Sequence, residues 1–355
     1  MRRDDAPSIR SEAPPRARVV DIARRAAVST ATVDRVLNAR AGVRPAPAQK
    51  VLRAAAALDY LPEGDLAAAA RPRPAQLLFL LPSGTNRFLH LLGDYVEFSD
   101  EHWRPYNVKC RTQFFEGFDP DVLAESLLRA ARRADGIVFM AIEHPRVREA
   151  VSRLADGGLP VVTLISDLSH SRRIAYVGLD NRAAGRTAGY LLGRFIGARR
   201  GKVALIAGSR SYRAHEEREM GFLHAIEETF PALQVVGLRE GHDDAERNYR
   251  QTRALIEQHR DLIGIYNIGG ASDGIGRALK EAGLSETVVF IGHGLSPDTR
   301  GLLIDGTLDA VITQDPQPML ASCVRIFANL REGRDALAGV EPARISLVLR
   351  ENLPA

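Results

Sequence analysis

From residue 76 onward, short apolar segments alternate with segments of helical periodicity, and this alternation limits the possible folds more than any other feature. Most of the apolar segments are hydrophobic at successive positions, as strands are when both faces of a parallel sheet are covered. We predict strands over residues 77–81, 108–115, 136–141, 161–165, 203–208, 235–238, 262–267, 288–292 and 310–313. The predicted helices cover residues 121–134, 145–155, 182–196, 216–229, 245–259, 273–282 and 316–332.

Two sets of these strand–helix units, residues 76–191 and 193–313, indicate an α/β core of two lobes, each a doubly wound parallel sheet. The helix over residues 316–332 and a final strand over 344–349 would then return across the hinge. The first lobe would hold residues 76–191 and 316–340, and the second would hold 193–313 and 342–355.

Residues 19–38 have a different character and predict two short helices joined by a tight turn. Apolar residues recur at helical spacing on either side of residues 27–29, where Ser29 is suited to cap the second helix. The two apolar faces comprise Val19, Ile22, Ala23 and Ala26, then Val33, Val36 and Leu37. The outer face of the second helix, where a helix-turn-helix meets the DNA major groove, carries Thr30, Ala31, Thr32 and Arg35. The alternative is an ordinary helical hairpin on a globular protein.

A third helix over about residues 46–59 would close this small core with Val51, Leu52, Ala55 and Leu58. Residues 1–75 hold 14 Arg/Lys and 8 Asp/Glu, whereas the other 280 residues hold 34 and 36. This basic N-terminal part suits contact with phosphates. A solvated basic tail would explain the charges of residues 1–17, which predict a disordered arm, but not those inside the helices.

The motif V-x-D-I-A-x-x-A-x-V-S-x-x-T-V-x-R-V-L-N over residues 19–38 closely resembles the N-terminal signature of the lac-repressor (LacI/GalR) family. The similarity continues in residues 176–181, 184–185, 188–189, 203–208, 218–222, 314–315 and 351–353. It implies a helix-turn-helix domain over residues 18–62, a hinge over 63–75, and a two-lobed periplasmic-binding-protein-like core over 76–355. The implied DNA-binding residues are Val19, Ser29, Thr30, Ala31, Thr32, Arg35, Asn38 and Leu66.

The hinge departs from the pattern of the resembled family. In that family a hinge helix inserts a leucine into the minor groove and kinks the DNA. That leucine aligns with Ala69 here, and Leu66, about one turn earlier, is the large apolar residue that could replace it. We therefore expect a weaker wedge and a smaller bend.

The common motifs of nucleotide-phosphate binding and of metal binding are absent from the sequence. It contains no G-x-x-x-x-G-K-[ST], H-E-x-x-H or paired C-x-x-C motif, and we expect neither an enzyme nor a cofactor or metal. The two cysteines, Cys110 and Cys323, are far apart, and the N-terminus lacks an apolar signal segment. These features, with no run long enough to span a membrane, favour a protein of the reducing cytoplasm.

A ligand cleft is expected where the two lobes face each other, outside the C-terminal ends of the strands. Asp180 and Arg218 match residues that bind sugar hydroxyls in the resembled family, and Phe88 could stack on a sugar ring. The full set of candidate ligand-binding residues is Asn86, Arg87, Phe88, Glu143, Asp180, Arg218, Asn267, His293 and Gln314.

Three of these candidates have structural alternatives. Asp180, with Asn181, could simply cap the following helix. Phe88 could pack between lobes. His293 could be structural, because the family has an aspartate one residue later where this chain has Gly294.

Together these features predict a homodimeric transcriptional repressor that binds operator DNA and a sugar or polyol effector. The dimer follows from a motif that reads two halves of one pseudo-palindromic site. One alternative is the solute-binding protein of a sugar transport system, which would share the core. The other is a sugar-acting enzyme on the same fold.

Overall fold

The computed structural model describes residues 17–354 apart from residues 39, 41, 44 and 61–72. The chain divides into two compact units, Met1–Pro74 and Ala75–Ala355, each described by itself below. The predicted arm up to residue 16 and the predicted wedge residues Leu66 and Ala69 lie outside the described residues.

The N-terminal unit is a three-helix bundle around a small apolar core, as the sequence predicted. Its helices are α1 (Val19–Ala26), α2 (Thr30–Leu37) and α3 (Pro45–Ala56). Ser29 caps α2, since its hydroxyl oxygen accepts a hydrogen bond from the Thr32 amide at 3.2 Å. The buried side chains are Ile22, Ala23, Ala26, Val33, Val36, Val51, Ala54 and Ala55.

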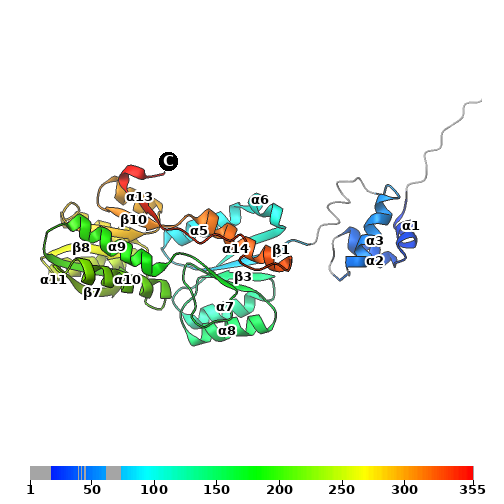
Figure 1. The fold of residues 1–355 in the computed structure, drawn as a ribbon, viewed down its shortest axis with the longest axis horizontal. Coiled ribbons are helices and arrows are strands. Elements are labelled where there is room, and N and C mark those ends of the chain that lie inside the picture. The colour runs from blue at the N-terminus through cyan, green and yellow to red at the C-terminus, as the bar shows by residue number, and fades with distance from the viewer. Residues whose placement is uncertain (1–16, 39, 41, 44, 61–72, 355) are drawn as a thin grey trace, which may run out of the picture. The chain divides into compact units, whose positions relative to one another are not determined.

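The first lobe of the core unit is a five-stranded parallel sheet covered by helices on both faces (Figure 1). Its strand order is β2-β1-β3-β4-β5: β1 (Ala75–Pro82), β2 (Val108–Phe115), β3 (Gly136–Phe139), β4 (Val161–Leu164) and β5 (Ala175–Val177). α7 (Pro120–Ala130) and α8 (Pro145–Asp156) cover one face, and α5 (Arg87–Phe98) and α14 (Pro316–Arg331) cover the other. The short helices α6 (Asp100–Trp103) and η1 (Arg104–Tyr106) lead into β2.

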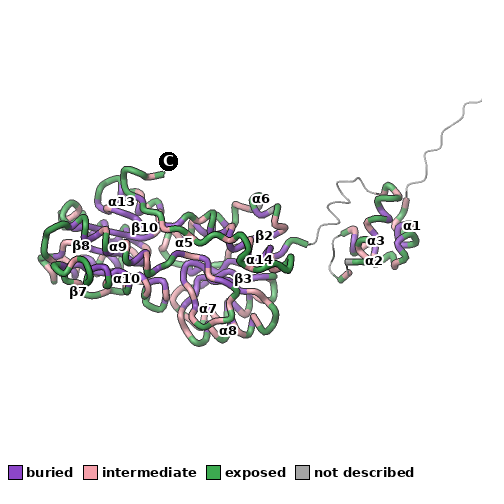
Figure 2. Tube along the Cα trace, viewed as in Figure 1, coloured by how far each residue is buried: buried purple, intermediate pink, exposed green. Residues whose placement is uncertain are grey.

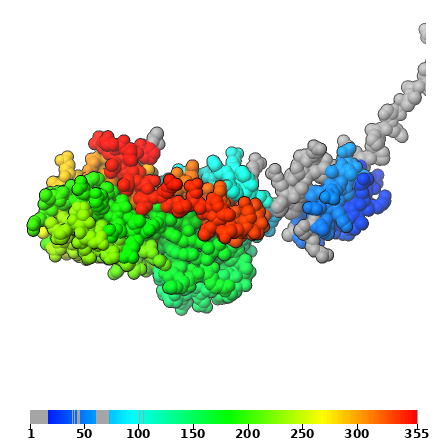
Figure 3. Space-filling model, viewed as in Figure 1, coloured from blue at the N-terminus to red at the C-terminus, as the bar shows by residue number. Residues whose placement is uncertain are grey.

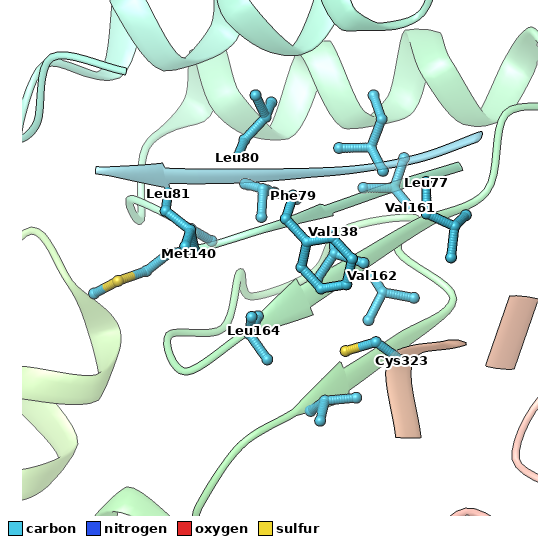
Figure 4. Close-up of a cluster of buried hydrophobic side chains, with 14 of the residues drawn as sticks. Leu77, Phe79, Leu80, Leu81, Val138, Met140, Val161, Val162, Leu164 and Cys323 are labelled. Carbon is cyan, nitrogen blue, oxygen red and sulfur yellow. The ribbon is translucent and has the colours of Figure 1, made fainter. Parts of the chain in front are cut away.

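The core of this lobe joins segments that lie far apart in the sequence. Figure 4 shows Leu77, Phe79 and Val138 of the sheet packed in one cluster with Cys323 of α14. Gly136 lets α14 approach the sheet, because a Cβ there would lie 2.3 Å from the Phe327 ring. The C-terminal helix is therefore an integral layer of the first lobe.

The second lobe is a six-stranded sheet in the order β11-β10-β9-β8-β6-β7, with only β11 antiparallel to its neighbour. The strands are β6 (Gly201–Ala207), β7 (Leu233–Glu240), β8 (Leu262–Asn267), β9 (Val289–His293), β10 (Ala310–Thr313) and β11 (Ser346–Val348). The helices are α9 (Asn181–Ile196) and α10 (Arg213–Thr229) on one face, and α11 (Ala245–Gln258), α12 (Ser272–Glu281) and α13 (Pro297–Ile304) on the other. The inner strands of both sheets are largely buried, whereas the edge strands β2, β7 and β11 are partly exposed (Figure 2).

Within residues 75–354 the chain passes between the lobes at residues 178–180, at 314–315 and between α14 and β11. Figure 3 shows this last segment, in orange to red, running over both lobes. The predicted boundary after residue 191 is wrong, because α9 packs wholly on the second lobe. Its Ala184, Ala188 and Leu192 belong to that lobe's core.

Three α-helices and one strand of the core were not predicted: α5, α6, α13 and β5. No helix is predicted directly after the first strand, where Asn86, Arg87 and Phe88 are candidate ligand-binding residues. The buried Leu89, Leu92 and Val96 nevertheless follow helical spacing. Arg87 and Phe88 therefore stand in the first turn of a helix rather than in a loop.

Candidate functional site

The candidate DNA-reading surface is the exposed face of α2. Thr30, Ala31 and Arg35 are exposed there, and the Arg35 side chain forms no hydrogen bond or ion pair with any described residue. A guanidinium without a protein partner is available to a phosphate or a guanine edge.

The other predicted DNA-binding residues are partly engaged within the domain. The Ser29 and Thr32 hydroxyls lie 2.9 Å apart. Asn38 donates to the Asp34 carboxylate at 2.8 Å, so it also secures the end of α2. Val19 is half-buried at the start of α1.

A small cavity of about 50 Å³, here called the inner cavity, lies between the two lobes of the core. It brings together the predicted residues Asn86, Phe88, Arg218, His293 and Gln314. Lining residues that were not predicted are Leu89, Met140, Ile165, Leu179, His215, Gly269, Gly270, Gly294, Ile312 and Thr313. The lining thus combines aromatic and aliphatic side chains with a few polar ones, as sites for small polar ligands do.

Arg218 of α10 is the charged group of this cavity and is only 6% exposed. Its Nε donates to Asn181 Oδ1 at 2.8 Å, and its Nη1 donates to the Ile268 carbonyl at 2.9 Å. Burial lowers its pKa, yet a guanidinium remains charged in proteins. No described residue accepts a hydrogen bond from Nη2.

Asn181 continues this arrangement into the hinge. Its Nδ2 donates to the Tyr176 hydroxyl at 3.0 Å, and that hydroxyl lies 2.9 Å from the backbone oxygens of both Ile165 and Leu179, to one of which it can donate its proton. The guanidinium is therefore held by neutral groups that span the first crossing between the lobes.

Two histidines lie in the same wall. Nε2 of His293 is 2.6 Å from the Tyr266 hydroxyl, and Nδ1 of His215 is 2.9 Å from the Ser209 carbonyl oxygen. Burial lowers the pKa of both imidazoles, to about 4 for His215. Both are therefore neutral near pH 7 and can each offer one donor and one acceptor.

Glu143 and Asp180 do not reach the inner cavity. They line a larger cavity of about 510 Å³, the outer cavity, with Asp167, Glu216, Glu217 and Arg213 among its other residues. Asp180 Oδ1 accepts from the Ala183 amide at 2.9 Å and so caps α9. Asn181, rather than Asp180, faces Arg218.

Ion pairs organise the outer cavity. Burial by itself would raise the pKa of Glu143, but hydrogen bonds from the Ser169 amide and from Arg148 hold it below its usual range. Asp167 behaves in the same way through Arg173 and Thr163.

The two remaining candidates lie elsewhere. Arg87 is exposed and forms an ion pair with Asp298 at 3.0 Å. Asn267 is fully buried, and its Nδ2 donates to the Gly270 carbonyl and the Ser272 hydroxyl, each at 2.9 Å. Asn267 therefore shapes the loop after β8 without lining the cavity.

A contact between the lobes was not predicted, and we call it the latch: Thr85 and Asn86 of the first lobe with Asp243 of the second. Asp243 Oδ2 accepts from Asn86 Nδ2 at 2.9 Å, and the Thr85 hydroxyl donates to the Asp243 carbonyl. Oδ1 of Asp243 accepts from the Gly270 amide at 2.7 Å. Asp243 follows the end of β7. This position after a strand is the sequence signal that could have identified it as a candidate residue.

Other bonds also cross between the lobes. The Glu143 amide donates to the Ser211 carbonyl at 2.8 Å, and Arg213 donates to the Ser169 hydroxyl at 2.6 Å. The structure therefore represents a closed arrangement of the two lobes.

Among the described residues, no cluster of three or more His, Cys, Asp or Glu side chains is arranged to hold a metal ion. None of the helices that the structure describes combines the length and the apolar character needed to cross a membrane.

Two family models match the chain. The model for bacterial regulatory proteins of the lacI family matches residues 19–63, and a periplasmic binding protein domain matches residues 101–335. A solved structure, the glucose-galactose binding protein GanP from Geobacillus stearothermophilus, is 24% identical with a TM-score of 0.71. It covers 79% of this chain and 99% of that one. These features define a helix-turn-helix regulator joined to a two-lobed binding fold.

Curated relatives give the family. An HTH-type transcriptional regulator in the aml 5′ region of Streptomyces limosus is 32% identical over 255 residues, which are 71% of this chain and 67% of the relative. The ribose operon repressor of Halalkalibacterium halodurans is 28% identical over 69% of this chain and 70% of that relative. The chain belongs to the lacI family of bacterial regulatory proteins, and it is a DNA-binding transcriptional regulator.

Proposed function

We propose that the protein represses transcription by binding operator DNA through α2, and that a small sugar or polyol in the inner cavity controls its operator affinity. The observation that carries the proposal is the convergence of Arg218, Asn86 and Gln314 from both lobes on one cavity beside the Phe88 ring. A ligand that contacts both lobes stabilises one lobe arrangement over the other, and only such differential affinity can change DNA binding.

The protein acts as a homodimer in this proposal, because a helix-turn-helix reads each half of a pseudo-palindromic operator. The surface that would join two copies is on the first lobe, where Tyr95 and Phe98 of α5 and Phe114 of β2 are exposed. Phe98 is 86% exposed, and β2 is an edge strand of its sheet. We also place the protein in the cytoplasm, where chromosomal DNA is accessible.

The solute-binding alternative fits the core, whose solved relatives include transport binding proteins. It leaves the helix-turn-helix unexplained. The enzyme alternative has no support from the two curated relatives named above, both of which are regulators.

Two steps test the proposal. The full-length protein first selects its binding site from a pool of DNA sequences. Fluorescence anisotropy then measures its affinity for that site with and without a panel of sugars and polyols. Arg35→Ala should weaken operator binding by about 1–3 kcal/mol and relax base preference at one position, if Arg35 reads a guanine. Arg53→Ala removes the same charge from α3 and should leave base preference unchanged.

An unchanged footprint and base preference in Arg35→Ala would refute the assignment of α2 as the reading helix. Control by a small sugar or polyol would be refuted if none of the sugars, polyols, sugar acids or phosphate esters tested changed the operator affinity.

A further inference from the structure

The polar wall of the inner cavity carries a positive charge without a matching negative one. Its polar side chains are Asn86, His215, Arg218, His293, Thr313 and Gln314, and none of the described residues that line it is acidic. The carboxylates that the sequence suggested for this site, Glu143 and Asp180, line the outer cavity instead. The carboxylates therefore line the outer cavity, and the described lining of the inner cavity carries the charge of Arg218 alone.

The guanidinium of Arg218 contacts only neutral protein acceptors, Asn181 and Ile268. The carboxylates that influence it, Asp243 and Glu217, are bonded elsewhere and form no ion pair with it. Asp243 accepts bonds in the latch, and Glu217 accepts from Arg213 at 2.6 Å. A buried charge of this kind is best satisfied by an opposite charge, and the free Nη2 can donate to it.

A second group in the cavity has no partner. Gln314 is 5% exposed, and its Oε1 is buried without a hydrogen-bond partner among the described residues. An amide oxygen accepts, so its complement is a donor such as a hydroxyl. A ligand that carries an anionic group for Arg218 and a hydroxyl donor for Gln314 Oε1 would satisfy both groups.

Charge narrows the class further. The cavity of about 50 Å³ favours a small ligand. The single guanidinium balances one negative charge, which suits a carboxylate better than a phosphate dianion.

Resting on the function proposed above, we propose that the effector is a small hydroxy-carboxylate, a sugar acid. Its carboxylate accepts hydrogen bonds from Arg218, and one of its hydroxyls donates to Gln314 Oε1. The Phe88 ring and the Leu179 side chain cover its apolar face.

Calorimetric titration of the full-length protein with matched compounds tests this assignment. Each series holds the carbon skeleton nearly constant: glycerol, glycerate and glycerol 3-phosphate; xylose and xylonate; glucose, gluconate and glucose 6-phosphate. We expect at least one acid to bind about tenfold or more tightly than its neutral partner and to change operator affinity at the same concentration.

Two variants connect the preference to Arg218. Arg218→Gln removes the charge, and Asn181→Asp gives the guanidinium an internal counter-ion at nearly constant volume. Both should reduce acid binding by about tenfold or more. Arg186→Gln is the matched control, because Arg186 is exposed and paired with Glu228 at 2.8 Å on the outer surface of α9 and α10. It should bind the acid like the wild type.

A neutral sugar or a phosphate ester that binds as tightly as the corresponding acid overturns the sugar-acid assignment, as does a panel in which no acid binds. Wild-type affinity for the acid in folded Asn181→Asp also overturns it. These outcomes leave the proposed function standing where a neutral compound still changes operator affinity.

Discussion

His215 is an ionisable side chain buried in the core unit, with 4% of its surface exposed. Burial lowers the pKa of its imidazole to about 4, and the charge of Arg218 acts in the same direction while Asp243 opposes it. In the unfolded chain the pKa returns to about 6.5. Between these two values the unfolded state binds more protons, so folding stability rises with pH across this window and is lost as pH falls.

We therefore expect the free energy of unfolding of the core to decrease by up to about 3 kcal/mol between about pH 6.5 and pH 4 because of His215. His215→Asn should flatten this part of the pH dependence. Urea unfolding followed by the fluorescence of Trp103, the single tryptophan and a core residue, measures it. His224→Asn, at an exposed position, should retain the wild-type slope. A slope unchanged in His215→Asn would contradict the role of His215.

At the level of elements, the packing of α9 against α10 determines where Arg218 stands. A Cβ at Gly185 would lie 2.0 Å from the Arg218 carbonyl oxygen, and a Cβ at Gly221 would lie 2.1 Å from that of Arg182. The helices approach so closely because these positions lack side chains. Backbone atoms cannot yield as a flexible side chain can.

Gly185→Ala should consequently destabilise the core by about 1–3 kcal/mol through overpacking and should weaken effector binding by displacing Arg218. Gly301→Ala is the matched control, since a Cβ there meets no atom within 4 Å in α13. Removing a helical glycine at that open position should stabilise the protein by about 0.5–1 kcal/mol. Thermal unfolding of both variants measures these stability changes, which should be opposite in sign. Equal stability of Gly185→Ala and the wild type would contradict this packing account.

The order of strands and helices could be predicted from sequence because it depends on local patterns of apolar residues. β2, β8 and β10 were predicted with the bounds that the structure gives. The membership of α9 in the second lobe could not be predicted, since it depends on contacts with α10 that periodicity does not encode.

The candidate site likewise has parts that local sequence patterns predict and parts that depend on tertiary contacts. Positions after strands led to Asn86, His293 and Gln314, which line the inner cavity. They could not separate Asp180 from Asn181, whose neighbouring side chains leave the first turn of α9 in different directions. One caps the helix, and the other bonds Arg218.

In the function proposed above, a ligand signal passes through contacts between the lobes, and the latch is one of these contacts. Thr85→Val removes the hydroxyl that donates to the Asp243 carbonyl. The loss of one hydrogen bond of about 1 kcal/mol should raise the open population about fivefold.

Hydrogen–deuterium exchange at residues 242–244 and 269–270 measures this opening, because the Gly270 amide donates to Asp243. We expect faster exchange there in Thr85→Val. Thr187→Val loses a hydroxyl that bonds only within α9, to the Ala183 carbonyl, and should exchange like the wild type. Identical exchange in Thr85→Val and the wild type would refute the latch.

Assembly of two copies is the other prediction for the whole molecule. Phe98→Glu places a charge on the exposed apolar surface of α5 and should weaken self-association by about tenfold or more, with operator affinity falling in parallel. Sedimentation equilibrium measures it. Phe195→Glu makes the same change at an exposed site on α9 and should leave the dimer intact. The reverse pattern would place the interface on the second lobe.

The latch also has a consequence for gene expression. Its bonds join protein to protein, so they favour closure whatever fills the cleft, and the effector needs to supply only the remaining free energy. A regulator built this way responds at lower effector concentrations, because less binding energy is spent on moving the lobes. The same bonds narrow the ratio between fully induced and fully repressed promoters, since part of the conformational change is already made. Strengthening or weakening Thr85, Asn86 and Asp243 would therefore exchange sensitivity for dynamic range.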